Sequence, residues 1–282
     1  MIRRHPLGVT ALGTAVAIGL GLVVQHRLGA PGSAMVIQAA AAGLGALLAL
    51  GIARARLPGR EAVRASVLIV LLVIMALPLV FGPELAGARR WLQLGPVSTQ
   101  PSMILLPVVI WLAAAGRASP VSSLLVLAHG AVLALQFDAA ALTGLTLAWA
   151  ASRALCPQRD ALHGWLVSAA LLALSVHAWI RPDDLPSVAY VEQVLPGAWQ
   201  AGAVTGAMAS LAAVLVVAMF AVPERKDRAL VAGLAAFYTG LVGAALIGNY
   251  PLPVVGLGAS LVLGWLIALG LAAARPIKGM PS

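Results

Sequence analysis

Apolar segments of nearly membrane-spanning length recur along the whole chain, and this pattern restricts the fold more than any other feature of the sequence. An α-helix needs roughly 20 apolar residues to cross the hydrocarbon core of a bilayer. Segments of about that length lie at residues 7–25, 33–53, 65–82, 101–116, 120–136, 139–155, 162–180, 201–222, 229–248 and 253–274. We therefore expect an all-α integral membrane protein, a polytopic bundle of ten transmembrane helices in one domain over residues 1–282. A re-entrant turn at Asp138, in place of two helices, is the alternative for the fifth and sixth segments.

The composition excludes a soluble domain. Hydrophobic residues make up 61% of the chain and charged residues 10%, and the mean hydropathy is +0.99. The surface of a soluble domain carries roughly 25–35% charged residues, which this chain cannot supply. The protein is therefore expected to have lipid, rather than water, around most of its surface.

The distribution of basic residues predicts how the helices are oriented. If the N-terminus is cytoplasmic, 14 of the 18 lysines and arginines fall in cytoplasmic segments, and the other side holds Arg27, Arg89, Arg90 and Arg181. The positive-inside rule then places both termini in the cytoplasm. The net charge of +9 follows from this topology and from anionic lipid at the inner surface, so it does not indicate binding to nucleic acid.

A short polar loop at residues 87–102 carries the most specific chemistry of the chain. Arg89 and Arg90 are adjacent there, and a guanidinium group holds phosphate at two points. Trp91 follows, and tryptophan settles at the depth of lipid headgroups. These residues suit a lipid-linked phosphate, although snorkelling arginines that anchor ordinary headgroups would show the same pattern.

Other kinds of site have little support in the sequence. Cys156 is the single cysteine, so no disulfide or cysteine cluster is expected. No metal-ligand spacing and no glycine-rich phosphate loop is present, and we expect neither a metal nor a cofactor. Proline-interrupted helices at Pro78, Pro107, Pro251 and Pro253 leave a transporter as an alternative.

Three segments resemble motifs of one protein family. The sequence Gly87-Ala-Arg-Arg-Trp91 followed by Gln100-Pro-Ser102 resembles the GARRW…QPSE signature of the SEDS family (shape, elongation, division and sporulation), which includes FtsW, RodA and SpoVE. Residues 135–138 resemble its QPD motif, and residues 249–260 resemble its LPTTGIPLPFISYGGS segment. The resemblance extends over residues 7–274 and implies ten helices in the bacterial inner membrane, with both termini cytoplasmic.

The resemblance also implies a substrate and a partner. SEDS proteins polymerise glycan strands at the outer membrane face from lipid II, an undecaprenyl-pyrophosphate-linked precursor, usually beside a transpeptidase (penicillin-binding protein). The substrate-binding residues that it implies here are Arg89, Arg90, Trp91, Gln100, Ser102 and Asp138. Asp138 has two other interpretations, since it can cap the next helix or pair with one of the loop arginines.

The sequence departs from the family at positions that matter for catalysis. The glutamate of QPSE is Met103, the residues after QPD are Ala139–Ala141, and the large outer loop before the eighth helix has shrunk to residues 181–200. Aligning Leu195-Pro196 with the family's Leu-Pro places Ala201 at the position of an essential aspartate. A positioned general base contributes roughly 10²- to 10⁴-fold to a rate, and alanine cannot replace it.

Three acidic residues of the shortened loop, Asp183, Asp184 and Glu192, are candidate replacements for the missing base. We expect a protein of cell shape, division or peptidoglycan synthesis that recognises lipid II or a related polyprenyl-pyrophosphate precursor, with polymerase activity weak or lost. An active, compact glycosyltransferase is one alternative. A flippase that transports a lipid-linked precursor is the other.

Overall fold

A computed structural model describes residues 6–55, 61–95, 97–114, 119–155, 162–181, 185–222 and 227–274. These residues form eleven helices and one short hairpin, and five of the helices are long and apolar enough to cross a membrane. The expected all-helical, polytopic membrane fold is confirmed. The elements are α1 (Pro6–Arg27), α2 (Gly32–Arg54), α3 (Glu61–Phe81), β1 (Leu92–Leu94), β2 (Val97–Thr99), α4 (Pro101–Ala114), α5 (Pro120–Leu135), α6 (Ala139–Ala154), α7 (Leu162–Ile180), α8 (Val194–Gln200), α9 (Ala203–Ala218), α10 (Arg228–Ile247) and α11 (Ala259–Ala273).

Ten of these helices coincide with the ten apolar segments of the sequence, and α8 is an additional helix inside the predicted outer loop. The chain around Asp138 forms the two separate helices α5 and α6, so the re-entrant turn is wrong. The last helix begins at Ala259 rather than near residue 253. Pro251 and Pro253 explain the delay, because proline lacks an N–H and disfavours helical geometry in the residue before it.

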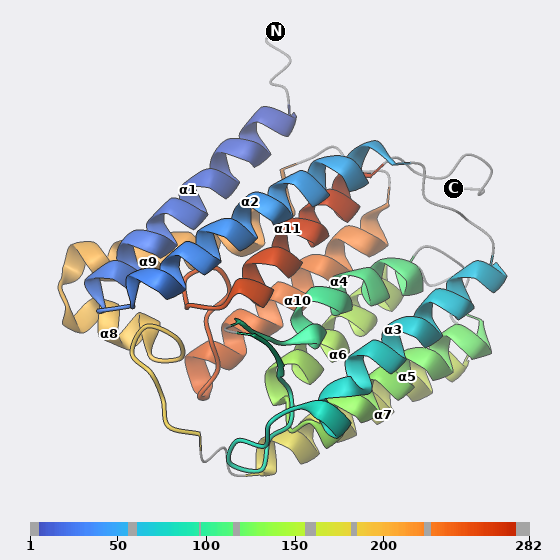
Figure 1. Cartoon of the computed structure of the whole chain (residues 1–282). Helices are drawn as coiled ribbons and strands as arrows, with labels where there is room; N and C mark the ends of the chain where they lie inside the picture. Colours follow the sequence, from blue (N-terminus) through green and yellow to red (C-terminus); the bar gives the residue numbers. More distant parts are fainter. Residues whose placement is uncertain are drawn as a thin grey trace, which may run out of the picture.

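The helices pack in a layered bundle. Figure 1 shows α10 and α11 in the middle, with α1 and α2 on one side and α3, α5 and α7 on the other. A close approach joins α6 to α10, where a Cβ atom added to Gly240 would lie 2.9 Å from the Cα atom of Gly144. Small residues at such positions let transmembrane helices pack backbone to backbone. The large buried side chains at the centre, such as Trp265, Phe237 and Tyr238, come from α10 and α11.

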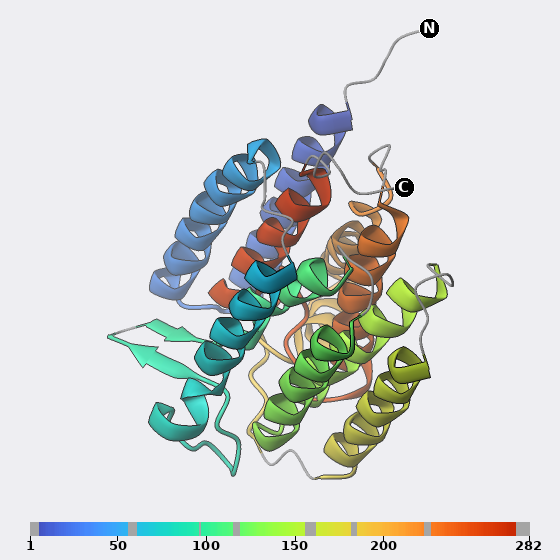
Figure 2. The same cartoon turned by 90° about the vertical axis from the view of Figure 1, so that its right-hand side faces the viewer.

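One end of the bundle carries the irregular segments of the chain, and we call it the hairpin end. The hairpin β1–β2 lies there, and Figure 2 shows that it projects sideways from the bundle rather than along the helices. The segment between α10 and α11, residues 248–258, lies at the same end without regular structure.

Two buried glutamines hold the segment between α10 and α11 in place. Gln25 of α1 donates to the carbonyl of Val255 at 2.9 Å, and Gln38 of α2 donates to the carbonyl of Val254 at 3.1 Å. The Oε1 atom of Gln38 also accepts from the backbone N–H of Gly258 at 2.7 Å. Val254 has a φ of 68°, which is strained for a β-branched residue and persists where the surroundings enforce it.

Candidate binding site

A cavity of about 270 Å³ lies at the hairpin end. Its wall is built from the first turns of α2, the hairpin, the start of α4, the N-terminus of α6, the loop before α8 and the segment before α11. The polar side chains that line it are those of Arg90, Ser98, Gln100, Asp138, Glu192 and Ser260. Four of these were predicted as site residues, and Trp91 also lines the cavity.

Arg90 is the buried cation of this cavity. Its guanidinium lies 4.5 Å from the ring centre of Trp91 and 5.4 Å from that of Tyr250. Its Nη1 atom donates to the carbonyl of Phe137 at 3.5 Å. Aromatic rings attract the faces of a guanidinium, whereas its N–H donors lie along its edges. Contact with two rings and a carbonyl restrains the guanidinium of Arg90 and suits it to hold a phosphate at two points.

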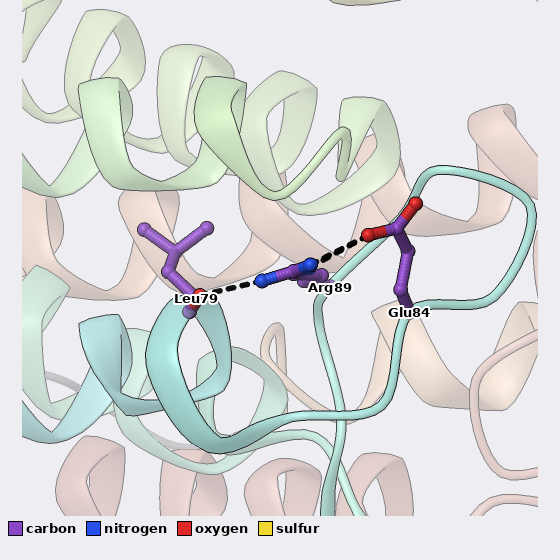
Figure 3. Close-up of polar contacts among 3 residues, drawn as sticks. All are labelled: Leu79, Glu84 and Arg89. Carbon is purple, nitrogen blue, oxygen red and sulfur yellow. Dashed lines mark hydrogen bonds and ion pairs between the residues drawn. The ribbon is translucent and has the colours of Figure 1, made fainter.

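Arg89 has different surroundings, although it is the neighbouring residue. Its side chain is exposed and forms an ion pair with Glu84, with Nη2 and Nε at 2.6 and 3.0 Å from the same carboxylate oxygen (Figure 3). Its Nη1 atom donates to the carbonyl of Leu79 near the end of α3 at 3.4 Å. Arg89 is not among the described residues that line the cavity. The structure therefore separates two arginines that the sequence treats as one phosphate-binding pair.

Asp138 brings three predicted residues together at the floor of the cavity. It is fully buried, and its Oδ2 atom accepts from Gln100 Nε2 at 2.7 Å and from Ser102 Oγ at 3.1 Å. Its Oδ1 atom accepts from the backbone N–H of Ala141 at 3.1 Å, which is an N-cap of α6. The helix-cap interpretation is confirmed. These hydrogen bonds fix the start of α4 against the start of α6.

Tyr250, in the segment before α11, and Ser260, in the first turn of α11, also belong to the site, although sequence reasoning did not select them. The ring of Tyr250 lies against the guanidinium of Arg90, and Ser260 Oγ accepts from the backbone N–H of Gln100 at 2.9 Å. The available signal was their position inside the stretch 249–260, which matches a family motif. Their contacts with residues 90–100 span about 160 positions, so they come from tertiary packing.

The three candidate bases of the shortened loop differ in whether the structure describes them and in whether they reach the cavity. Asp183 and Asp184 lie outside the described residues. Glu192 lines the cavity, and its Oε2 atom accepts from the backbone N–H of Val188 at 3.0 Å. Ala201 ends the short helix α8, is exposed, and is not among the described residues of the cavity wall. The cavity therefore holds a carboxylate from this loop, but at Glu192 and not at the position aligned with the family's aspartate.

Comparisons with known proteins agree with this fold. A model of the FtsW, RodA and SpoVE family, described as cell cycle protein, matches residues 7–123. The structure resembles the rod shape determining protein RodA of Thermus thermophilus, with 22% sequence identity, a TM-score of 0.65, and coverage of 93% of this chain and 94% of that chain. An aspartate-to-alanine mutant of that protein gives a TM-score of 0.64 at the same identity and coverage.

A third solved chain, from a study titled "Structural coordination of polymerization and crosslinking by a peptidoglycan synthase complex", is 24% identical with a TM-score of 0.60. The similarity covers 94% of this chain and 95% of that chain. No curated protein sequence matches. The family model matches the first part of this chain, and the fold of the RodA structures extends over nearly all of it.

Proposed function

We propose that this chain acts in peptidoglycan synthesis and binds lipid II, or a related polyprenyl-pyrophosphate-linked precursor, in the cavity at the hairpin end. The observation that carries the proposal is the guanidinium of Arg90, which lies near the rings of Trp91 and Tyr250 at the cavity wall. A buried, oriented guanidinium is a strong phosphate ligand because its donors match the phosphate oxygens and its surroundings exclude water. Gln100 and Ser260 add hydrogen-bonding groups to the same wall.

The size of the cavity indicates which part of the precursor enters it. Pockets that enclose a drug-sized ligand have volumes of roughly 300–1,000 Å³, and this cavity has about 270 Å³. It therefore suits the pyrophosphate and the adjoining part of one sugar rather than the whole disaccharide. The polyprenyl chain would remain in the lipid, beside the apolar cavity residues Ala34 and Ile37 of α2.

We further propose that glycan polymerisation by this chain is weak or lost. A general base needs a carboxylate oxygen within hydrogen-bond reach of the acceptor hydroxyl. Both oxygens of Asp138 already accept hydrogen bonds from the protein. Glu192 is the other described carboxylate of the cavity, and one of its oxygens is bound in the turn that starts at Val188. The full engagement of Asp138 and the partial engagement of Glu192 favour recognition of the precursor over its polymerisation.

The proposed setting is the bacterial inner membrane, with both termini cytoplasmic and the cavity at the outer face. A penicillin-binding transpeptidase is the proposed partner. Support comes from the match to the family model and from the structural relative studied in a peptidoglycan synthase complex. Such a partner would supply the crosslinking step for strands made by this chain or by another polymerase.

A second candidate function is supported by the position of Glu192 in the cavity wall. In an active glycosyltransferase, Glu192 would take the proton of the acceptor sugar hydroxyl as its oxygen attacks the anomeric carbon of the donor sugar. The bond from that carbon to the pyrophosphate oxygen would break, and the lipid pyrophosphate would leave with its negative charge stabilised by Arg90.

One experiment separates these functions. The purified protein is mixed with labelled lipid II, alone and with a candidate transpeptidase, and both binding and glycan polymer length are measured. We expect binding without extended polymer. Absence of binding by the folded protein would contradict the proposal, and rapid polymer formation that the Glu192→Gln variant loses would establish the second candidate. Transfer of labelled lipid II between leaflets of proteoliposomes, without polymer, would instead establish a flippase.

A further inference from the structure

The hairpin at the edge of the cavity has one apolar and one polar face. Its strands are antiparallel, with Leu92 opposite Thr99, Gln93 opposite Ser98, and Leu94 opposite Val97. Opposite residues in an antiparallel pair share a face, and successive residues alternate between faces. Leucine, valine and threonine therefore form one face of the hairpin, and Gln93 with Ser98 forms the other.

The apolar face extends beyond the helices. Leu94 lies at the tip and is 63% exposed, and the side chains of Leu92 and Val97 are partly covered. Figure 2 shows the hairpin pointing sideways from the bundle, across the direction of the helices. Because the helices cross the membrane, an arm in this direction runs along the membrane surface instead of away from it.

The neighbour of the hairpin presents an apolar surface to lipid. Strand β1 contacts α3, whose last two residues, Val80 and Phe81, are 72% and 74% exposed. These residues end a segment long and apolar enough to span a membrane. Trp91, which directly precedes the hairpin, belongs to the residue type that is enriched at headgroup depth. The strand that carries the exposed tip therefore contacts the helix that ends in these exposed apolar residues.

We propose that the hairpin is a membrane-surface arm, with Leu94 inserted among the lipids of the adjacent leaflet and Gln93 and Ser98 facing water. The occupant around the exposed apolar tip is phospholipid rather than a partner protein, because strand β1 contacts α3, which ends in exposed apolar residues, and because the hairpin has a polar face opposite its apolar one, as in interfacial elements. Val97 and Ser98 also line the cavity, so the arm joins the cavity wall to the membrane surface. The proposed role of the arm does not depend on which ligand binds in the cavity.

Two adjacent positions of β1 provide a matched test. In a cysteine-free background, Leu94→Cys and Gln93→Cys are labelled with an environment-sensitive NBD fluorophore, and the proteins are placed in phosphatidylcholine nanodiscs. Part of the lipid carries a doxyl quencher near the start of one acyl chain. We expect the doxyl lipid to quench the label at Leu94 at least twofold more than the label at Gln93, and aqueous iodide to show the reverse order.

Two reference positions calibrate the quenching, and a second reaction without the fluorophore tests the same two residues. Phe81→Cys serves as the lipid-facing reference and Ser187→Cys as the reference in the loop before α8. Without a fluorophore, an impermeant maleimide should modify Leu94→Cys at least tenfold more slowly than Gln93→Cys in the same nanodiscs. Equal quenching at the two positions, or faster maleimide reaction at Leu94→Cys, would overturn the proposal.

Discussion

Substitutions at Asp138 separate its hydrogen bonds from its charge. The Asp138→Asn variant keeps an oxygen for the Ala141 cap, and its new amide group can donate to Ser102 and, after rotation of the Gln100 amide, to Gln100 Oε1. All three contacts of the parent side chain are then retained in a neutral form. The Asp138→Ala variant retains none of them.

The two variants should differ clearly in stability. Loss of an N-cap costs about 1 kcal/mol, and a buried polar group left without a partner costs about 1–3 kcal/mol. Gln100 and Ser102 are both buried, so Asp138→Ala should lose about 3–7 kcal/mol. Hydrogen bonds to a charged group exceed neutral ones by about 1 kcal/mol each, so Asp138→Asn should lose about 3 kcal/mol over its three bonds.

Thermal unfolding of the purified proteins in one detergent measures this difference. One kcal/mol shifts the midpoint by roughly 2–4 °C in domains of about this size, so with losses of about 5 and about 3 kcal/mol we expect Asp138→Ala to unfold about 4–8 °C below Asp138→Asn. Binding of a polyprenyl-pyrophosphate probe should follow the same order, since Asp138 fixes the cavity floor. If Asp138→Asn is as unstable and binds as weakly as Asp138→Ala, the charge is essential and the hydrogen-bond account is refuted.

Three further predictions follow from other parts of the structure. The Gln38→Leu variant should unfold at lower temperature and bind the probe more weakly, because the carbonyl of Val254 and one further backbone N–H lose a buried partner; an unchanged midpoint would contradict this. Cysteines at Ser98 and Ser187 should react with an impermeant maleimide added at the outer face of intact cells, and reaction only after lysis would invert the topology. Glu192→Gln should leave binding of the probe unchanged within about twofold if Glu192 has no direct contact with phosphate, and a large loss would show that it shapes the anion site.

The sequence predicted the membrane-spanning elements well because their signal is local. A run of about twenty apolar residues has few alternatives to a transmembrane helix, whatever its neighbours are. Helix α8 was missed because it is seven residues long, lies in a polar loop and contains Pro196, which is tolerated in the first turn of a helix. The late start of α11 depends on the path that Gln25 and Gln38 impose on residues 254–258, and these contacts join distant parts of the chain.

The sequence predicted several residues of the candidate site but not how their side chains are arranged. Motif resemblance selected Arg90, Gln100 and Asp138, which the structure brings to one cavity. It did not distinguish Arg89 from Arg90, because adjacent side chains of an extended segment point in different directions and the sequence does not say which direction faces the bundle. The contact of Tyr250 with Arg90 joins residues 160 positions apart, and only tertiary packing reveals it.

The central claim is that Arg90, and not Arg89, holds the phosphate of a lipid-linked precursor. The most direct measurement is the affinity of a fluorescent polyprenyl-pyrophosphate probe for the parent protein and for Arg89→Lys and Arg90→Lys, each shown to be folded by its unfolding midpoint. Lysine keeps the charge but lacks the planar fork of donors. We predict that Arg90→Lys weakens binding at least tenfold, about 1.4 kcal/mol, and that Arg89→Lys stays within about twofold of the parent because its ion pair with Glu84 lies outside the cavity wall. Parent-like affinity in Arg90→Lys, or an equal loss in both variants, would contradict the account.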